Sequence, residues 1–190
     1  QNPNGPIDPT PTIAMVGLIE KAEHITTQWF KDEGDVIILL GAVVDAADPL
    51  GGLGGSAYLQ TVHGLKTGPP SRCDLEQERK LHDLVRVLIR SGQVKSAHDC
   101  SEGGLAVAIA ESCISQQVAR DTPRLIGALL DLSAFSGLRL DALLFGETQS
   151  RIIISVPPGK AGAVLAEAKK AGVEAAEVGK IGGAELQIRT

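Results

Sequence analysis

Apolar residues recur along the chain at two spacings, and these spacings predict its elements. Short apolar runs bounded by turn residues predict strands at residues 13–19, 35–44, 94–98, 127–132, 151–156, 174–178 and 185–188. Apolar residues three and four apart predict helices at 74–91, 105–115 and 160–171, and a shorter one at 140–144. Some connections are tight turns and others are helical crossovers, which favours a mixed sheet. The predicted fold class is α+β, layered α/β/α.

The ends of the predicted elements also indicate how the chain is organised. Asp74 has the side chain of a helix N-cap, and Gly92 has the backbone freedom that ends a helix. Residues 1–12 are rich in Pro, Gly and Asn and are predicted to be a linker, so that one domain covers residues 13–190. The chain opens at Gln1 and its only methionine is Met15, so we expect it to be a piece of a longer protein.

Composition and charge exclude several classes of function. Apolar residues make up 43% of the chain but aromatic residues only 3%, so the interior must consist mainly of small aliphatic side chains. A net charge of -5 and so few aromatics argue against a nucleic-acid surface. The chain contains neither a long apolar run nor a basic start followed by one, so we expect a cytoplasmic protein with no membrane contact. The odd number of cysteines, without zinc-type spacing, predicts reduced thiols.

The strongest candidate for chemistry is the segment His98-Asp99-Cys100-Ser101-Glu102-Gly103-Gly104 between a predicted strand and a helix. Asp99 offers an oxygen ligand for Mg²⁺, and the amides at a helix start favour an anion such as a phosphate. Gly103 and Gly104 allow a ligand or another backbone to approach closely. The alternative is that Asp99 or Ser101 only caps the helix and that the glycines only relieve crowding. A His98–Cys100 nucleophilic pair is the weaker hypothesis, because a buried histidine beside a buried thiol is commoner.

Two further segments carry polar or flexible residues whose role the sequence leaves open. The cluster at residues 49–56 has the glycines of a phosphate loop but neither the Walker A lysine nor the dinucleotide spacing, so it is either a turning loop or the edge of a ligand site. Residues 145–151 gather a carboxylate, an amide, two hydroxyls and a guanidinium, from Glu147, Gln149, Thr148, Ser150 and Arg151. These groups could bind a sugar phosphate, or Glu147 and Arg151 could form a solvated ion pair.

Four segments, taken together, resemble one family. They are NPNGPIDPTPTIAMVGLIE at residues 2–20, LGGLGGSAYL at 50–59, AHDCSEGGLAVAIAES at 97–112 and LFGETQSRIIIS at 144–155. In this order they resemble blocks of phosphoribosylformylglycinamidine synthase, within the wider group of aminoimidazole ribonucleotide synthetase-like C-terminal domains. The Pro-Thr-Pro entry at residues 9–11 is similar to that of the synthase and separates it from the rest of the group.

The resemblance implies a fold, an activity and partners. The fold is a layered α/β/α domain, partly ferredoxin-like, the last of four domains in two synthetase halves. The activity is the ATP-dependent conversion of formylglycinamide ribonucleotide and glutamine-derived ammonia to formylglycinamidine ribonucleotide. The partners are the preceding domains of the same polypeptide, a glutaminase subunit and a small bridging subunit. The general base and the remaining metal ligands lie in those domains, so the chain alone is expected to be inactive.

The resemblance also implies roles for individual residues. Asp99 matches a Mg²⁺ ligand of a nucleotide site, and Ser101, with Gly103 and Gly104, matches a segment that contacts the nucleotide, ATP or ADP. Residues 147–149 match a substrate-binding stretch of the other half, and we expect Glu147, Thr148 and Gln149 to contact substrate or nucleotide. Two alternatives stay open: a domain of an aminoimidazole ribonucleotide synthetase-type enzyme, and a non-catalytic assembly module with the same fold.

Overall fold

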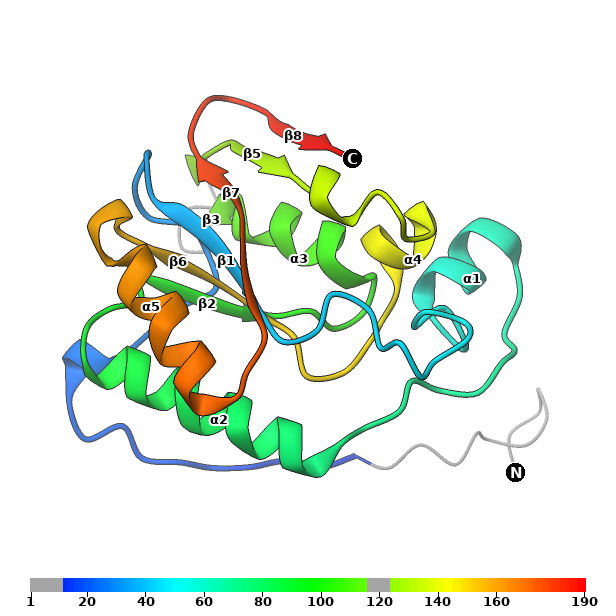
Figure 1. Cartoon of the computed structure of the whole chain (residues 1–190), viewed down its shortest axis with the longest axis horizontal. Helices are drawn as coiled ribbons and strands as arrows, with labels where there is room; N and C mark the ends of the chain where they lie inside the picture. Colours follow the sequence, from blue (N-terminus) through cyan, green and yellow to red (C-terminus); the bar gives the residue numbers. More distant parts are fainter. Residues whose placement is uncertain (1–11, 116–123) are drawn as a thin grey trace.

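The computed structural model describes residues 12–115 and 124–190, and these form a six-stranded sheet with helices on both faces (Figure 1). Only Thr12 of the predicted linker 1–12 lies within the described residues. The six strands of the large sheet are β1 (Val36–Leu40), β2 (Ser96–Asp99), β5 (Ala128–Asp131), β6 (Ile152–Val156), β7 (Ala175–Ile181) and β8 (Leu186–Arg189). The helices are α1 (Ala57–His63), α2 (Leu75–Arg90), α3 (Gly104–Ser112), α4 (Leu140–Phe145) and α5 (Pro158–Ala171), with 3₁₀ turns η1 (Ala22–His24) and η2 (Ser133–Phe135). A second sheet has two strands, β3 (Ile114–Ser115) and β4 (Arg124–Leu125).

Part of the sheet has ferredoxin-like topology. The strands lie in the order β2-β6-β1-β7-β5-β8, and the first four are joined as two units, β1-α2-β2 and β6-α5-β7. Neighbouring strands among these four are antiparallel, whereas β5 and β8 are parallel to each other. Each unit thus contains a helical crossover between two strands that are not neighbours. The prediction of a mixed, partly ferredoxin-like sheet is confirmed.

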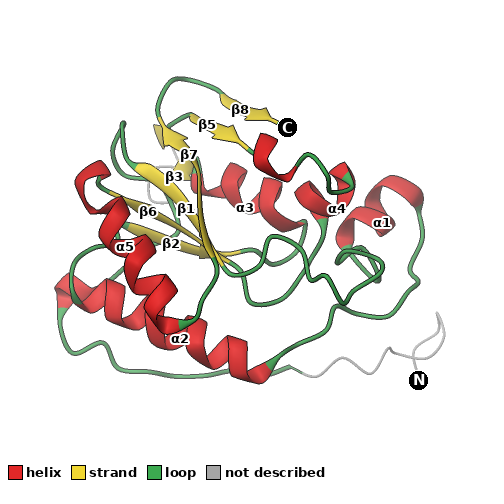
Figure 2. Ribbon diagram, in the orientation of Figure 1, coloured by secondary structure: helices red, strands yellow, loops and turns green. Residues whose placement is uncertain are grey.

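Strand β1 lies in the middle of the sheet, and alternate side chains enter two different cores. Ile37 and Leu39 pack with α3 and α4, whereas Val36, Ile38 and Leu40 pack with α2 and α5. All five residues of β1 are buried, because a strand covered on both faces needs apolar residues at every position. Figure 2 shows the helices on the two sides of the strands. The α/β/α layering predicted from the sequence is confirmed.

Most predicted elements form close to their predicted ends. The Asp74 carboxylate caps α2 by accepting hydrogen bonds from the amides of Glu76 (3.0 Å) and Gln77 (3.2 Å). The chain leaves the helix through Gly92 at φ 65°, in the left-handed region. Strand β1 is shorter than predicted, because the chain leaves the sheet after Leu40 and residues 41–44 are not part of the strand. The short helix α1 was not predicted, since its sequence carries no clear apolar stripe.

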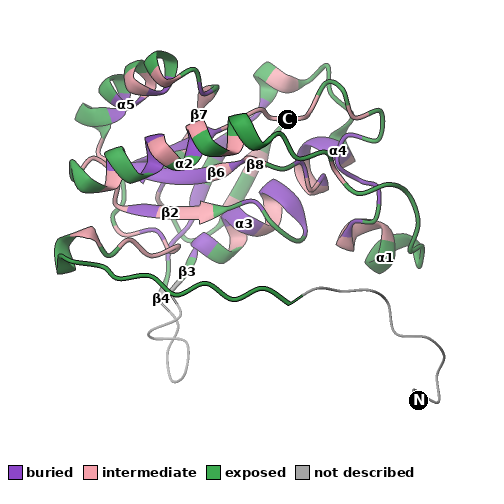
Figure 3. Cartoon of the chain, turned by 90° about the horizontal axis from the view of Figure 1, so that it is seen from below, coloured by how far each residue is buried: buried purple, intermediate pink, exposed green. Residues whose placement is uncertain are grey.

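The strand predicted at residues 13–19 is wrong. This segment is extended but pairs with no strand among the described residues, and its side chains face solvent: Ile13 is 83% exposed, Val16 101% and Leu18 89%. Figure 3 shows it as an exposed trace that lies outside the helices. An apolar run forms a strand only where it pairs with a sheet edge, and the segment 13–19 pairs with neither edge strand of the described sheet.

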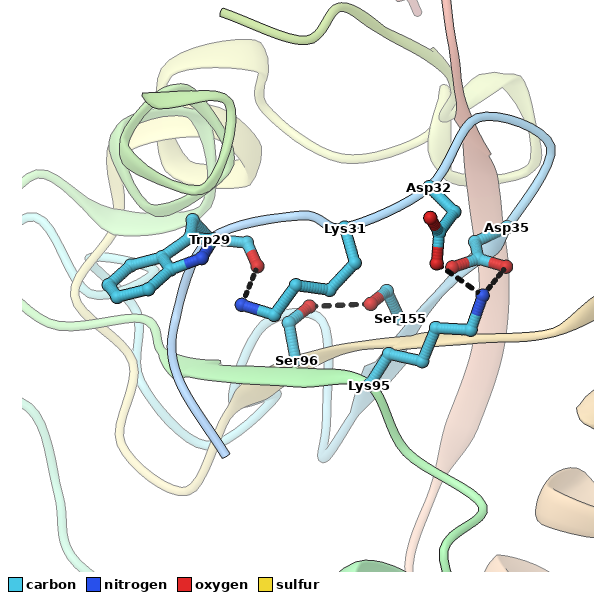
Figure 4. A network of polar contacts seen from close by, with 7 residues as sticks. All are labelled: Trp29, Lys31, Asp32, Asp35, Lys95, Ser96 and Ser155. Atoms are coloured by element: carbon cyan, nitrogen blue, oxygen red, sulfur yellow. Dashed lines mark hydrogen bonds and ion pairs between the residues drawn. The ribbon is translucent and has the colours of Figure 1, made fainter. Parts of the chain in front are cut away.

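A polar network connects the segment that precedes β1 to the start of β2 (Figure 4). The Lys95 ammonium donates to carboxylates of Asp32 (2.8 Å) and Asp35 (2.9 Å), and Asp35 is buried. The hydroxyls of Ser96 and Ser155, opposite each other in β2 and β6, share a hydrogen bond of 2.6 Å. These pairs fix the register of β2 against β6, because a slip by one residue would separate the buried hydroxyls.

Within the described residues, no helix has the length and apolar character needed to cross a membrane.

Candidate functional site

The turn from β2 into α3 presents an ionised carboxylate to solvent. Asp99 is the last residue of β2, and its side chain is 68% exposed. The Ser101 hydroxyl donates a short hydrogen bond to Asp99 Oδ2. This bond, helped by His98 Nδ1 at 3.5 Å from Oδ1, lowers the pKa of Asp99 against the opposing effect of burial. Asp99 is therefore charged at neutral pH.

Asp99 and Ser101 line one wall of a cleft of about 220 Å³. The same cleft is lined by Gln149 and Ser150, from the loop between α4 and β6, and by Glu78 and His82 of α2. The Ser150 hydroxyl donates to Glu78 (2.8 Å), and His82 lies 3.1 Å from the same carboxylate. The structure thus brings together Asp99, Ser101 and Gln149, three of the residues predicted from separate sequence blocks. Ser150 belongs to the polar segment 145–151 noted in the sequence. Glu78 and His82 were not predicted, and their only signal was the polar face of helix 74–91.

The amides of Gly103 and Gly104 make hydrogen bonds within the domain, and neither glycine lines this cleft. Their contact with a nucleotide stays a prediction. The Gly103 amide donates to Glu147 Oε1 (2.9 Å), and the Gly104 amide donates to the Ser101 carbonyl (3.1 Å). A Cβ on Gly104 would lie 2.5 Å from the Gly146 carbonyl oxygen, so glycine permits a close approach of two backbones there. At these two positions the structure agrees with the alternative of capping and relief of crowding.

Glu147 and Thr148 belong to a packed junction rather than to the cleft. Glu147 Oε1 accepts a second hydrogen bond, from the amide of Ala57 at the start of α1 (2.8 Å). Thr148 is only 4% exposed, and its Oγ1 has no hydrogen-bond partner among the described residues. A Cβ on Gly52 would meet this hydroxyl at 2.8 Å and the amides of Glu147 and Thr148 at 2.7 Å. The glycine cluster 49–56 is therefore a turning loop that docks on residues 146–148.

The solvated ion pair between Glu147 and Arg151 does not form. Arg151 is 3% exposed, and its guanidinium donates to the carbonyls of Thr148 (3.0 Å), Val43 (3.0 Å) and, in a shorter bond, Gly146. Burial lowers the pKa of Arg151. The guanidinium thus serves as an internal donor that satisfies carbonyls of two loops, which the sequence pattern alone did not indicate.

The cysteine chemistry considered for His98 and Cys100 has no geometric support. His98 Nε2 lies 2.8 Å from a carboxylate oxygen of Glu111, so this ring nitrogen is paired with a residue of α3. Burial raises the pKa of the Cys100 thiol to about 11, so the nucleophilic thiolate is scarce at neutral pH. Cys100 and Cys113 are buried and Cys73 is exposed, and all three are free thiols as predicted.

The described residues do not form a complete metal site. No group of three or more His, Cys, Asp or Glu side chains lies close enough together to hold a metal ion, within residues 12–115 and 124–190. Asp99 fits the role of a single oxygen ligand, because its carboxylate is exposed and ionised. A Mg²⁺ ion held by Asp99 would complete its shell with water, nucleotide phosphates or other oxygen ligands.

The chain belongs to a known family of domains. Residues 32–189 match the family model described as AIR synthase related protein, C-terminal domain. The chain is 42% identical over 183 residues to the phosphoribosylformylglycinamidine synthase subunit PurL of Anaeromyxobacter sp. (strain K). The matched region covers 95% of this chain and 23% of that relative. It is also 42% identical over 186 residues to the PurL subunit of Moorella thermoacetica, covering 98% of this chain and 23% of the relative. The chain thus spans about a quarter of the length of these relatives.

Solved structures share the fold at lower sequence identity. The structure of T. maritima PurL complexed with FGAR superposes with a TM-score of 0.65 at 20% identity, covering 84% of this chain and 26% of that one. E. coli HypE, a hydrogenase maturation protein, superposes with a TM-score of 0.56 at 21% identity, covering 86% of this chain and 48% of that one. Proteins of different function therefore share this fold, so fold alone does not select among them.

Proposed function

We propose that this chain is a domain of a phosphoribosylformylglycinamidine synthase. The observation that carries the proposal is the 42% identity to PurL subunits over 95–98% of the chain. The whole protein would convert formylglycinamide ribonucleotide, ATP and glutamine-derived ammonia to formylglycinamidine ribonucleotide, ADP and phosphate, a step of purine biosynthesis. The predicted boundary between a linker at 1–12 and a domain at 13–190 belongs to the same proposal.

Within that enzyme, the Asp99 cleft contributes one wall of an ATP/Mg²⁺ site. The Asp99 carboxylate is exposed and ionised, as a Mg²⁺ ligand must be, and the Ser101 hydroxyl lies beside it. Gln149 lines the same cleft and would contact the same ligand. A bound Mg²⁺ would neutralise the phosphate charge of the nucleotide. Gly103, Gly104, Glu147 and Thr148 would support this wall from behind.

The remaining parts of the enzyme would come from outside this chain. The exposed apolar side chains at residues 13–19 support this, because isolated domains rarely leave such a contiguous apolar segment in water. The relatives are about four times as long, since the chain covers 23% of each. A glutaminase subunit and a small bridging subunit are the further partners that we propose, together with a cytoplasmic location. T. maritima PurLQS, a solved structure, contains the same fold.

The decisive experiment is a chimera. The present 190 residues replace the matched segment of the Moorella thermoacetica subunit, and the hybrid is expressed in a bacterium that lacks its own synthase. We expect growth without added purine and amidine formation by the purified hybrid. The unmodified Moorella subunit is the positive control. A hybrid that folds but forms no amidine would reject the proposal.

The non-catalytic assembly module is the second candidate, and the occupied amides of Gly103 and Gly104 favour it. Calorimetry of the chimera with Mg²⁺ and ADP separates the two candidates. The cleft role predicts that Asp99→Ala weakens nucleotide binding at this site. His24→Ala should leave it unchanged, because His24 is not among the residues that line the cleft. Equal binding by the Asp99→Ala and unmodified chimeras would favour the assembly module.

A further inference from the structure

A single carboxylate oxygen joins two distant parts of the chain. Glu147 Oε1 accepts hydrogen bonds from the amides of Ala57 (2.8 Å) and Gly103 (2.9 Å), which precede it by 90 and 44 residues. Ala57 is the first residue of α1, and Gly103 immediately precedes α3. Amides at the first positions of a helix have no carbonyl partner within that helix. The carboxylate supplies the missing partner to both.

The backbone around Glu147 is held on both sides as well. Its amide donates to the Gly52 carbonyl (2.8 Å), and the ring of Phe145 stacks on Tyr58 of α1 with centroids 5.0 Å apart and planes 10° apart. On the other side, Gly104 approaches the Gly146 carbonyl as closely as only a glycine can. Glu147 therefore lies at the centre of a junction of three segments.

We propose that Glu147 is a positioning residue that sets the place of Asp99 and Ser101 in the cleft. A chain of hydrogen bonds connects them. The Glu147 carboxylate accepts a hydrogen bond from the Gly103 amide, and the Gly104 amide donates to the Ser101 carbonyl (3.1 Å). The Ser101 hydroxyl in turn donates to the Asp99 carboxylate. The junction thus fixes the turn between β2 and α3 relative to α1. The positioning role rests on the proposed function in one respect, namely that Asp99 is the residue that contacts the ligand.

The opposing reading is that Glu147 touches a ligand directly through its charge. Two substitutions separate the readings. Glu147→Gln keeps an oxygen that accepts from both amides but removes the charge, whereas Glu147→Ala removes the acceptor itself. Gln149→Ala is the matched control, because Gln149 is two residues away, is exposed and lines the cleft.

The experiment measures amide hydrogen exchange by NMR on the 190-residue chain. In Glu147→Ala we expect the amides of Ala57 and Gly103 both to exchange at least about tenfold faster, the change expected when a hydrogen bond to a charged group is lost. In Glu147→Gln and Gln149→Ala we expect both rates to stay within about threefold of the unmodified chain. The Leu39 amide in the central strand reports global unfolding and is the internal reference.

Several outcomes would overturn the proposal. One is that Glu147→Ala speeds exchange at only one of the two amides, or at neither, relative to Leu39. If Glu147→Ala does not fold, Glu147→Asp replaces it; its shorter carboxylate cannot reach both amides, and unchanged exchange at both would again contradict the proposal. These results do not depend on whether a nucleotide binds.

A second measurement, in the chimeric synthase, tests the effect on the cleft. Glu147→Gln should bind Mg²⁺ and ADP within about threefold of the unmodified chimera, whereas Glu147→Ala should bind at least about tenfold more weakly. A Glu147→Gln chimera with both amides protected but binding weakened tenfold would make Glu147 a ligand contact and reject the positioning role. Absence of binding in the unmodified chimera would reject the proposed function instead, and the exchange result would still stand.

Discussion

The Asp99 cleft and the Glu147 junction are built from neighbouring residues of the same sequence blocks, yet they have opposite physical character. In the cleft, Asp99 is mostly exposed and Gln149 faces solvent. In the junction, Thr148 and Arg151 are almost completely buried. The Asp99 and Gln149 side chains in the cleft are open to solvent, whereas Glu147 and Arg151 in the junction bind backbone amides and carbonyls.

A run of polar residues in the sequence therefore need not form a single site. Residues 147–151 look like a single ligand-binding stretch in the sequence, but the structure divides them between an open wall and the packing behind it. Substitutions in the junction should therefore cost stability, and substitutions in the cleft should cost binding. The predictions below test that division, beginning with the largest effect on stability.

Arg151→Ala should have the largest effect. It leaves the carbonyls of Thr148, Val43 and Gly146 without their donor in a buried place. Because each buried polar group without a partner costs about 1–3 kcal/mol, we expect a loss of about 4 kcal/mol of unfolding free energy, or failure to fold. Urea unfolding followed by circular dichroism measures it. Arg79→Ala, an exposed arginine of α2, is the control and should change stability by less than about 0.5 kcal/mol.

Gly52→Ala should follow, since it tests the close approach within the junction. A Cβ there meets backbone amides at 2.7 Å, and the residue has φ 81°. Gly183 has a similar φ, 77°, but a Cβ there meets nothing within 4 Å. We expect Gly183→Ala to cost about 1 kcal/mol from backbone strain alone and Gly52→Ala about 3 kcal/mol because overpacking adds to it. Equal losses for the two variants in urea unfolding would mean that the junction yields to an added methyl group.

The fold was predictable to the extent that local patterns decide it. Asp74 and Gly92 mark the ends of α2 because capping needs only neighbouring residues, and β1 carries the continuous apolar run of a strand buried on both faces. The apolar run at residues 13–19 carries the same kind of signal but forms no strand, because pairing depends on a distant edge that no local pattern reports.

The candidate site divides in the same way. Asp99 and Ser101 were predictable because a carboxylate and a hydroxyl stand before a predicted helix start. The bonds of Glu147 to amides 90 and 44 residues earlier were not predictable, because nothing in the spacing of the blocks says which of them meet. The glycines at 52 and 104 were the available signal: each marks a place where two backbones come too close for a side chain.

Cys100 lies at the boundary between the two regions, because it lines the cleft wall but is buried. Burial raises its pKa from 9.0 to about 11 in the folded protein. The folded state keeps the proton when the unfolded state loses it, so stability is complete below pH 9 and falls as the pH rises toward 11. We expect this loss to be about 2–3 kcal/mol. Thermal unfolding of Cys100→Ser and of the unmodified chain across this pH range measures the loss. If the unfolding temperature falls equally steeply with pH in both proteins, the thiol is accessible to water. Cys73→Ser, at an exposed cysteine, is the control.

Asp99→Ala should have the smallest effect on stability and the sharpest effect on binding. The carboxylate is mostly exposed, and its partner Ser101 can turn to solvent when the bond between them is lost. We therefore expect the unfolding free energy to change by less than about 0.5 kcal/mol, while Mg²⁺-dependent nucleotide binding in the chimera falls at least about tenfold. Ser101→Ala should be equally mild in urea and should weaken binding less, because it removes a neutral contact rather than a charge. If Asp99→Ala instead destabilised the domain as strongly as Gly52→Ala, Asp99 would belong to the packing behind the cleft, and the division between an open wall and a closed junction would fail at the residue on which the proposed function depends.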